Sequence, residues 1–271
     1  MNRTWLDFGP VLATLLAALA GLFLLHLVAS DLGDAAMVTV WLLMSLVLAR
    51  GLYRQARARR RLFIAAHVRA DSPLQRLLGG RLFLGLKAAL LAAVLGMLLP
   101  PFVVRLDQTA AWQLLLLHLP LAALAQVWLQ RSLARHLSAD YLPIACWRLG
   151  LGLNLGVLVI LLAVAGLHGS YPDMHGLSLV NAVSAEVALQ QAGSRVLLTA
   201  LQLHAALDAI AWWLAQQLTP AVGLPILQLG GWLLLFGVKA LFLWSYLLYL
   251  AGVLMLAAEV RTCWSRNGGG N

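Results

Sequence analysis

The chain contains little charge and almost no cysteine. Only 11% of its 271 residues are charged, against about a quarter in an ordinary soluble domain, whereas 62% are hydrophobic. This balance excludes an ordinary soluble domain and predicts that nearly all of the chain lies in one membrane bundle. The two cysteines, Cys146 and Cys263, fall at helix ends that we expect in the reducing cytoplasm, so we expect no disulfide.

Recognisable chemistry is also missing from the sequence. It contains no cofactor fingerprint, no nucleophile triad and no cluster with metal-ligand spacing. We therefore expect no enzymatic activity and no bound cofactor or metal. The net charge of +9 could suggest nucleic acid, but the positive residues fall on alternate connections, as they do in membrane proteins with arginine-rich cytoplasmic loops. This placement argues against a nucleic-acid partner.

What the sequence does contain is a series of long apolar runs. A helix needs roughly 20 apolar residues to cross a hydrocarbon core about 30 Å thick. Six runs meet this requirement, and they cover residues 8–29, 35–53, 82–104, 109–130, 146–167 and 226–258. The first run is longer than the core of a signal peptide, so we expect an uncleaved anchor. The predicted fold class is all-α, a polytopic bundle of six transmembrane helices forming a single domain over residues 1–271.

The arginines give the expected orientation. The connection 54–81 is the densest positive segment, and Arg261 and Arg266 lie beyond the last apolar run. Since positive residues concentrate on the cytoplasmic side, we expect both termini in the cytoplasm, with the bundle in an inner (plasma) membrane of bacterial type. Within the basic loop, Asp71-Ser72-Pro73 resembles a helix start, which predicts two short interfacial helices there.

The basic loop carries more positive charge than orientation requires. Each basic residue near a membrane surface attracts anionic headgroups by about 1 kcal/mol. We weigh two interpretations equally: a purely topogenic role, and binding of anionic lipid headgroups or an acidic cytoplasmic partner. The residues for the second role are Arg54, Arg57, Arg59, Arg60 and Arg61.

Residues 168–223 have a different pattern, in which polar residues increase and apolar residues recur at helical spacing. We expect an extracytoplasmic lobe of two amphipathic helices, at 177–191 and 195–218, with the second ending before Pro220. The alternative is that 195–218 is a seventh span or a re-entrant segment. A seventh span would place the C-terminal arginines outside, against the charge rule.

A few polar groups in these apolar segments are candidates for function. Lys239 lies near the middle of the last run, where a charge costs at least about 2.5 to 3.5 kcal/mol. It could serve a substrate path or a partner carboxylate, or the helix could protrude so that Lys239 reaches the membrane surface. His204 and Asp208 are four residues apart and share one helical face, either as a proton relay or as a hydrogen-bonded pair at the surface.

Two further pairs of residues are weaker candidates for a functional role. His26 and His118 occupy the outer halves of two runs and could ligate a haem, although intramembrane histidines more often form hydrogen bonds within a bundle. Gly152 and Gly156 form a small-residue pair that allows close approach of another helix, from this chain or from another copy.

These observations support three functional hypotheses. The first is a non-enzymatic, multi-spanning subunit of a larger assembly, such as an export, envelope or signalling complex, which binds other membrane subunits or itself. The second is a transporter or channel with a polar path through Lys239. The third is a haem- or quinone-binding membrane protein that uses the two histidines.

Overall fold

A computed structural model describes residues 3–67, 81–106, 109–138, 141–167, 173–174, 176–221 and 225–267, and all regular structure in these ranges is helical. Seven of the helices are long and apolar enough to cross a membrane, so the chain is a multi-pass, all-α membrane protein. The elements are α1 (Arg3–Val28), η1 (Ala29–Asp31), α2 (Asp34–His67), α4 (Arg81–Val104), α5 (Thr109–Ala134), α6 (Leu142–Leu167), α7 (Leu179–Ala188), α8 (Arg195–Ala221) and α9 (Pro225–Asn267).

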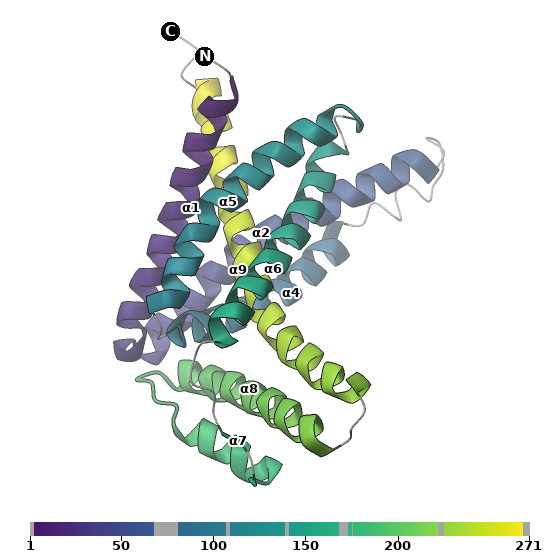
Figure 1. Ribbon diagram of the computed structural model, residues 1–271. Coiled ribbons are helices and arrows are strands. Elements are labelled where there is room, and N and C mark those ends of the chain that lie inside the picture. Colours follow the sequence, from purple (N-terminus) through teal and green to yellow (C-terminus); the bar gives the residue numbers. More distant parts are fainter. Residues whose placement is uncertain are drawn as a thin grey trace.

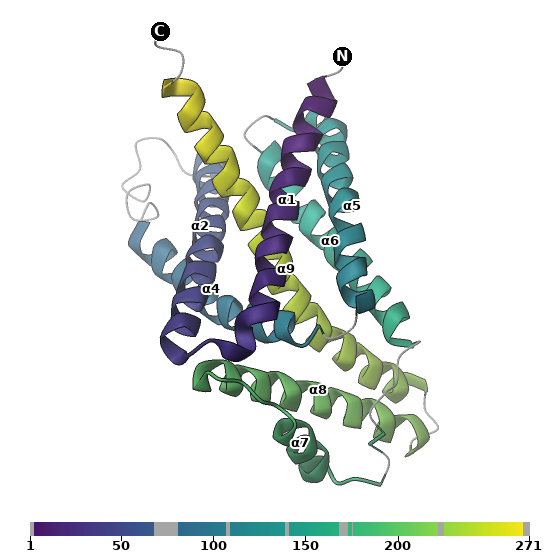
Figure 2. The ribbon, with the colours of Figure 1, turned by 90° about the vertical axis from the view of Figure 1, so that its left-hand side faces the viewer.

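The arrangement separates a helical bundle from a two-helix lobe. Helices α1, α2, α4, α5, α6 and the C-terminal part of α9 form the bundle, and both chain termini lie at one end of it (Figure 1). At the opposite end α8 lies across the bundle, and α7 packs on the side of α8 that faces away from it, as both views show (Figure 2). We call α7 and α8 the outer lobe.

The core of the bundle combines residues from most of the long helices. The largest buried side chains include Tyr246 and Phe242 of α9, and Tyr246 packs against Phe102 of α4 with ring centroids 6.2 Å apart. Helices α2 and α9 approach each other closely at two glycines: a Cβ added to Gly51 would lie 3.3 Å from the Cα of Gly252. This contact brings the N-terminal and C-terminal parts of the chain together.

The second helix is longer than the sequence predicted. We expected it to end near Tyr53 and to be followed by a loop with two short helices, but α2 continues without a break to His67. The charge rule locates the arginines on one side of the membrane but says nothing about backbone conformation, and arginine and alanine are strong helix formers. The predicted helix start at residues 71–73 lies outside the described residues.

Proline has less effect on the end of α8 than we predicted. We expected this helix to end before Pro220, but α8 continues one residue past it to Ala221, and the pair Pro100-Pro101 likewise lies inside α4, which ends at Val104. Proline has no backbone N–H, so it interrupts the series of backbone hydrogen bonds that holds the helix. Near the C-terminal end of a helix few residues follow the proline, so few further hydrogen bonds are affected. Pro225 is the first residue of α9. At this position the backbone N–H of any residue would have no partner within the helix, so proline loses nothing there.

Candidate functional site: a charged cluster beneath the outer lobe

The outer lobe has its own small core and its own capping interactions. Met174, Ala182 of α7 and Ala209 of α8 are buried together. The Trp213 indole N–H donates to the Leu177 carbonyl oxygen at 2.8 Å, and Ser178 caps α7 by accepting from the Asn181 backbone N–H. These contacts fix α7 on α8, so the two helices form one structural unit.

The first turn of α8 is attached to the connection between α1 and α2. The Gly193 backbone N–H donates to the Ser30 carbonyl oxygen at 2.9 Å, and a Cβ at Gly193 would lie 2.7 Å from that oxygen, so only glycine fits. The buried Ser194 hydroxyl donates to Asp34 Oδ1 at 2.7 Å and also accepts from the Leu197 N–H, as a helix N-cap does. This contact holds one end of the outer lobe on the bundle.

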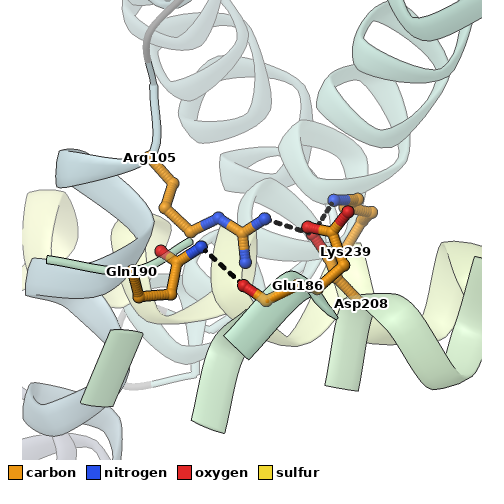
Figure 3. Close-up of polar contacts among 5 residues, drawn as sticks. All are labelled: Arg105, Glu186, Gln190, Asp208 and Lys239. Atoms are coloured by element: carbon orange, nitrogen blue, oxygen red, sulfur yellow. Dashed lines mark hydrogen bonds and ion pairs between the residues drawn. The ribbon is translucent and has the colours of Figure 1, made fainter. Parts of the chain in front are cut away.

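A second attachment, made of charged side chains, lies further along α8. Asp208 Oδ2 is 2.7 Å from Lys239 Nζ of α9 and 3.7 Å from Arg105 Nη2, which follows the end of α4 (Figure 3). The Asp208 side chain is only 11% exposed, whereas that of Lys239 is 41% exposed. One carboxylate therefore joins α8 to two elements of the bundle. We call Arg105, His204, Asp208 and Lys239 the charged cluster.

Three atoms of the charged cluster are buried without a hydrogen-bond partner among the described residues: Arg105 Nη1, His204 Nδ1 and Asp208 Oδ1. The His204 ring stacks on Phe242 with centroids 3.7 Å apart and planes 20° apart. Buried polar atoms of this kind usually contact ordered water or another small polar group.

The structure places the predicted polar residues together, although in different pairs. Asp208 directs one carboxylate oxygen to Lys239 and Arg105, whereas His204, its predicted partner, stacks on Phe242. Lys239 lies near the outer lobe, which fits the interpretation in which α9 protrudes and Lys239 reaches the membrane surface. Sequence reasoning missed Arg105. The available signal was an arginine in an expected outside connection, where the charge rule disfavours one.

The two histidines proposed as haem ligands contact different helices. His26 Nδ1 lies 3.1 Å from the Val103 carbonyl oxygen of α4, and His118 Nε2 lies 3.0 Å from Asn154 Oδ1 of α6. His118 is fully buried. These contacts favour a role in helix packing, and the haem or quinone hypothesis stays a prediction that an absorption spectrum of the purified protein tests.

Gly152 and Gly156, which we expected to pack against a helix, contact no other helix among the residues that the structure describes. A Cβ at Gly152 or Gly156 would meet nothing within 4 Å, and both residues are exposed. The close approaches occur at other glycines: a Cβ at Gly96 would lie 2.3 Å from Ser45 Oγ, and one at Gly252 would lie 2.8 Å from the Val47 carbonyl oxygen. Spacing alone does not show which face of a helix meets a neighbour.

The arginines at the opposite end of α2 divide into two groups. Arg50 and Arg54 both form ion pairs with Glu259 of α9, and the Arg50–Glu259 distance is 2.6 Å. Arg57, Arg59 and Arg61 are exposed, and Arg60 is partly buried. Part of the predicted basic cluster therefore joins α2 to α9, and Arg57, Arg59 and Arg61 lie at the surface of the chain.

Comparison of the chain with models of protein families, with curated proteins and with solved structures finds no match.

Proposed function

We propose that the chain is a non-enzymatic, multi-spanning subunit of a larger membrane assembly, such as an export, envelope or signalling complex. The observation that carries the proposal is the outer lobe, which two sets of polar contacts attach to the bundle. The lobe exposes large apolar side chains: Val180 of α7 is 75% exposed, and Leu189, the C-cap residue of α7, is 71% exposed. Exposed apolar groups on a firmly held surface element are typical of a contact site for another protein.

The proposal includes an orientation and a location. Both termini lie in the cytoplasm, α8 lies at the outer membrane surface and the bundle crosses an inner membrane of bacterial type six times. The ends of α1 and α9 lie at one end of the bundle, which supports an even number of crossings (Figure 2). The exposed arginines of α2 lie at the cytoplasmic surface, where anionic headgroups attract them.

Site-specific photo-crosslinking tests the proposal directly. A photoreactive amino acid replaces Val180 or Leu189 of the outer lobe, with Leu117 of α5 as the matched control. Leu117 is 59% exposed on a helix that crosses the membrane, so it samples lipid. We expect a defined protein adduct from both lobe positions and none from Leu117. If the lobe positions give the same products as Leu117, the outer lobe is not a partner surface.

The charged cluster supports a second candidate, a transporter or channel with a polar path through Lys239. The observation in its favour is the set of buried, unpartnered polar atoms beside Lys239 and Asp208. Replacing Lys239 with Met removes the charge while keeping a long apolar stem. A transporter of this kind loses uptake or conductance in the variant, whereas a structural subunit keeps its assembly. Unchanged flux in a folded Lys239→Met protein excludes the path.

A further inference from the structure

Three aromatic rings meet where α1 packs against the end of α4 and the start of α5. Phe23 and His26 of α1 stack with ring centroids 6.2 Å apart, and the Trp112 ring of α5 lies 5.1 Å from the Phe23 ring and 5.3 Å from the His26 ring. The Trp112 indole N–H donates to the Leu106 carbonyl oxygen at 2.9 Å. We call Phe23, His26 and Trp112 the aromatic group.

The two nitrogens of the His26 ring have different surroundings. Nδ1 lies 3.1 Å from the Val103 carbonyl oxygen, and since a carbonyl oxygen can only accept, Nδ1 carries the hydrogen. Nε2 of the neutral ring then has a lone pair, and no described residue donates to it. His26 is partly exposed, and Nε2 is not one of the buried polar atoms that lack a partner. This nitrogen is therefore an acceptor that a molecule in the membrane can reach.

His26 lies deeper in the membrane than the lipid headgroups. It is about 7 Å along the helix from Asp31, the last residue of η1. Leu27 and Val28, which lie nearer the end of the helix, and Leu24 all have exposed apolar side chains. Apolar surface on both sides of His26 indicates the depth of the hydrocarbon core. A charged headgroup is costly at this depth, whereas an uncharged, lipid-soluble molecule is not.

We propose that the aromatic group binds the ring of a membrane-soluble hydroquinone, one hydroxyl of which donates to His26 Nε2. The ligand needs a hydrogen-bond donor for the lone pair, a flat ring for contact with the aromatic side chains, and no net charge. A hydroquinone with an isoprenoid tail has all three properties. The oxidised quinone has only acceptor oxygens, so it cannot form the hydrogen bond with Nε2. The site therefore distinguishes the reduced form of the ligand from the oxidised form.

This site differs from the two-histidine site that the sequence suggested, because only His26 takes part. His118 is fully buried, and its Nε2 lies 3.0 Å from Asn154 Oδ1 of α6. The proposal goes beyond the proposed function, since it needs neither the outer lobe nor a partner protein. Its failure is therefore distinguishable from failure of the crosslinking test.

The test measures binding of a short-chain ubiquinol and of the corresponding ubiquinone to the purified full-length chain. Both are added anaerobically in detergent, and bound ligand is determined by equilibrium dialysis. The variants are His26→Leu and Phe23→Leu, and the control is His67→Leu in the last residue of α2. His67 is a matched residue, because its Nδ1 also lies 3.1 Å from a backbone carbonyl oxygen, that of Phe63, and its ring stacks on Phe63 at 4.7 Å.

The hydrogen bond to Nε2 gives the expected pattern. We expect the wild type to bind the quinol about tenfold more tightly than the quinone. His26→Leu should lose this preference, because leucine offers no acceptor. Phe23→Leu should weaken binding of both forms about threefold, because it removes only a ring contact. His67→Leu should bind both forms as the wild type does.

Several results would overturn the proposal. One is a preference for quinol that persists in His26→Leu, and another is an equal loss of binding in His67→Leu, which would indicate general partition into the micelle. A third is displacement of the quinol by phosphatidylethanolamine at the same concentration, which would make the ligand a headgroup ammonium.

His26→Leu also removes the contact with Val103, so its thermal unfolding without ligand is measured first. If this variant does not fold, Phe23→Leu decides the question. Phe23 is 42% exposed, and its ring forms no hydrogen bond, so we expect the substitution to leave the fold intact. An unchanged affinity of folded Phe23→Leu for the quinol would then contradict the site.

Discussion

At the scale of single residues, the outer attachment depends on one carboxylate. Asp208 lies among Arg105, Lys239 and His204, and it is the acid that compensates the first two charges. Removing Asp208 leaves two cations near each other, whereas removing Lys239 leaves Asp208 with Arg105. The two substitutions are therefore expected to differ in effect.

We expect Asp208→Asn to lower the free energy of unfolding by about 2 to 3 kcal/mol, and Lys239→Met by roughly 1 kcal/mol. The value for Lys239 is the smaller because its side chain is partly exposed and the loss is screened by solvent. Thermal or denaturant unfolding of the purified protein, followed by tryptophan fluorescence, measures both. Asp31→Asn, on an exposed acid at the same end of the bundle, is the control. Equal losses in the two cluster variants would contradict the unequal roles.

A second residue-scale prediction concerns the start of α8. Ser194→Ala removes both the cap on the Leu197 N–H and the hydrogen bond to Asp34. We expect a loss of about 1 to 2 kcal/mol in the same unfolding measurement. Ser184→Ala, which removes an exposed contact to a backbone carbonyl within α7, should change stability by less than about 0.5 kcal/mol. Similar values for the two serines would show that Ser194 does not hold the lobe.

Sequence reasoning identified three residues of the charged cluster, but it identified neither their pairing nor Arg105. Lys239, His204 and Asp208 were identified because ionisable groups in apolar segments are costly. Spacing could pair only His204 with Asp208, which share a helix face. The Lys239–Asp208 contact joins residues 31 positions apart, so it depends on how α8 packs on α9. Identifying Arg105 as a member of the charged cluster likewise requires knowing how the helices pack.

At the scale of elements, the sequence predicted most helices well, and the exceptions have identifiable causes. The apolar runs correspond to the long helices, because a run of this length has few alternatives in a membrane. The extension of α2 was missed because charge marks a side of the membrane and not a conformation. The glycine contacts were missed because Gly152 and Gly156 have the favourable spacing, whereas Gly51 and Gly252 meet only in the folded chain.

Glycines at a close helix contact and glycines in open space should respond differently to substitution by alanine. A Cβ at Gly252 would lie 2.8 Å from the Val47 carbonyl oxygen and 3.0 Å from Val47 Cγ1, so Gly252→Ala should force α2 and α9 apart. We expect a loss of about 2 kcal/mol or more. Gly152→Ala places the same methyl group in open space and should leave stability unchanged or raise it by up to about 1 kcal/mol. Equal destabilisation by both substitutions would contradict the observed packing.

At the scale of the whole molecule, the direction of α8 decides the topology. Length and composition make α8 a possible span, and its hydropathy is the lowest of the seven helices that qualify. In the fold it lies across the end of the bundle, attached at Asp34 and at Lys239 (Figure 1). This position is consistent with the six-span orientation that we propose, in which α7 and α8 form an outer surface.

Labelling of single cysteines is the most direct test of this central claim. Cys146 and Cys263 are replaced by Ala, and one new cysteine is introduced as Ser184→Cys in α7 or Asn271→Cys at the chain end. Sealed right-side-out membrane vesicles are then treated with a membrane-impermeant maleimide. We expect Ser184→Cys to react at once and Asn271→Cys to react only after detergent opens the vesicles. Reaction of Asn271→Cys in sealed vesicles would show that α8 crosses the membrane, and would contradict the account.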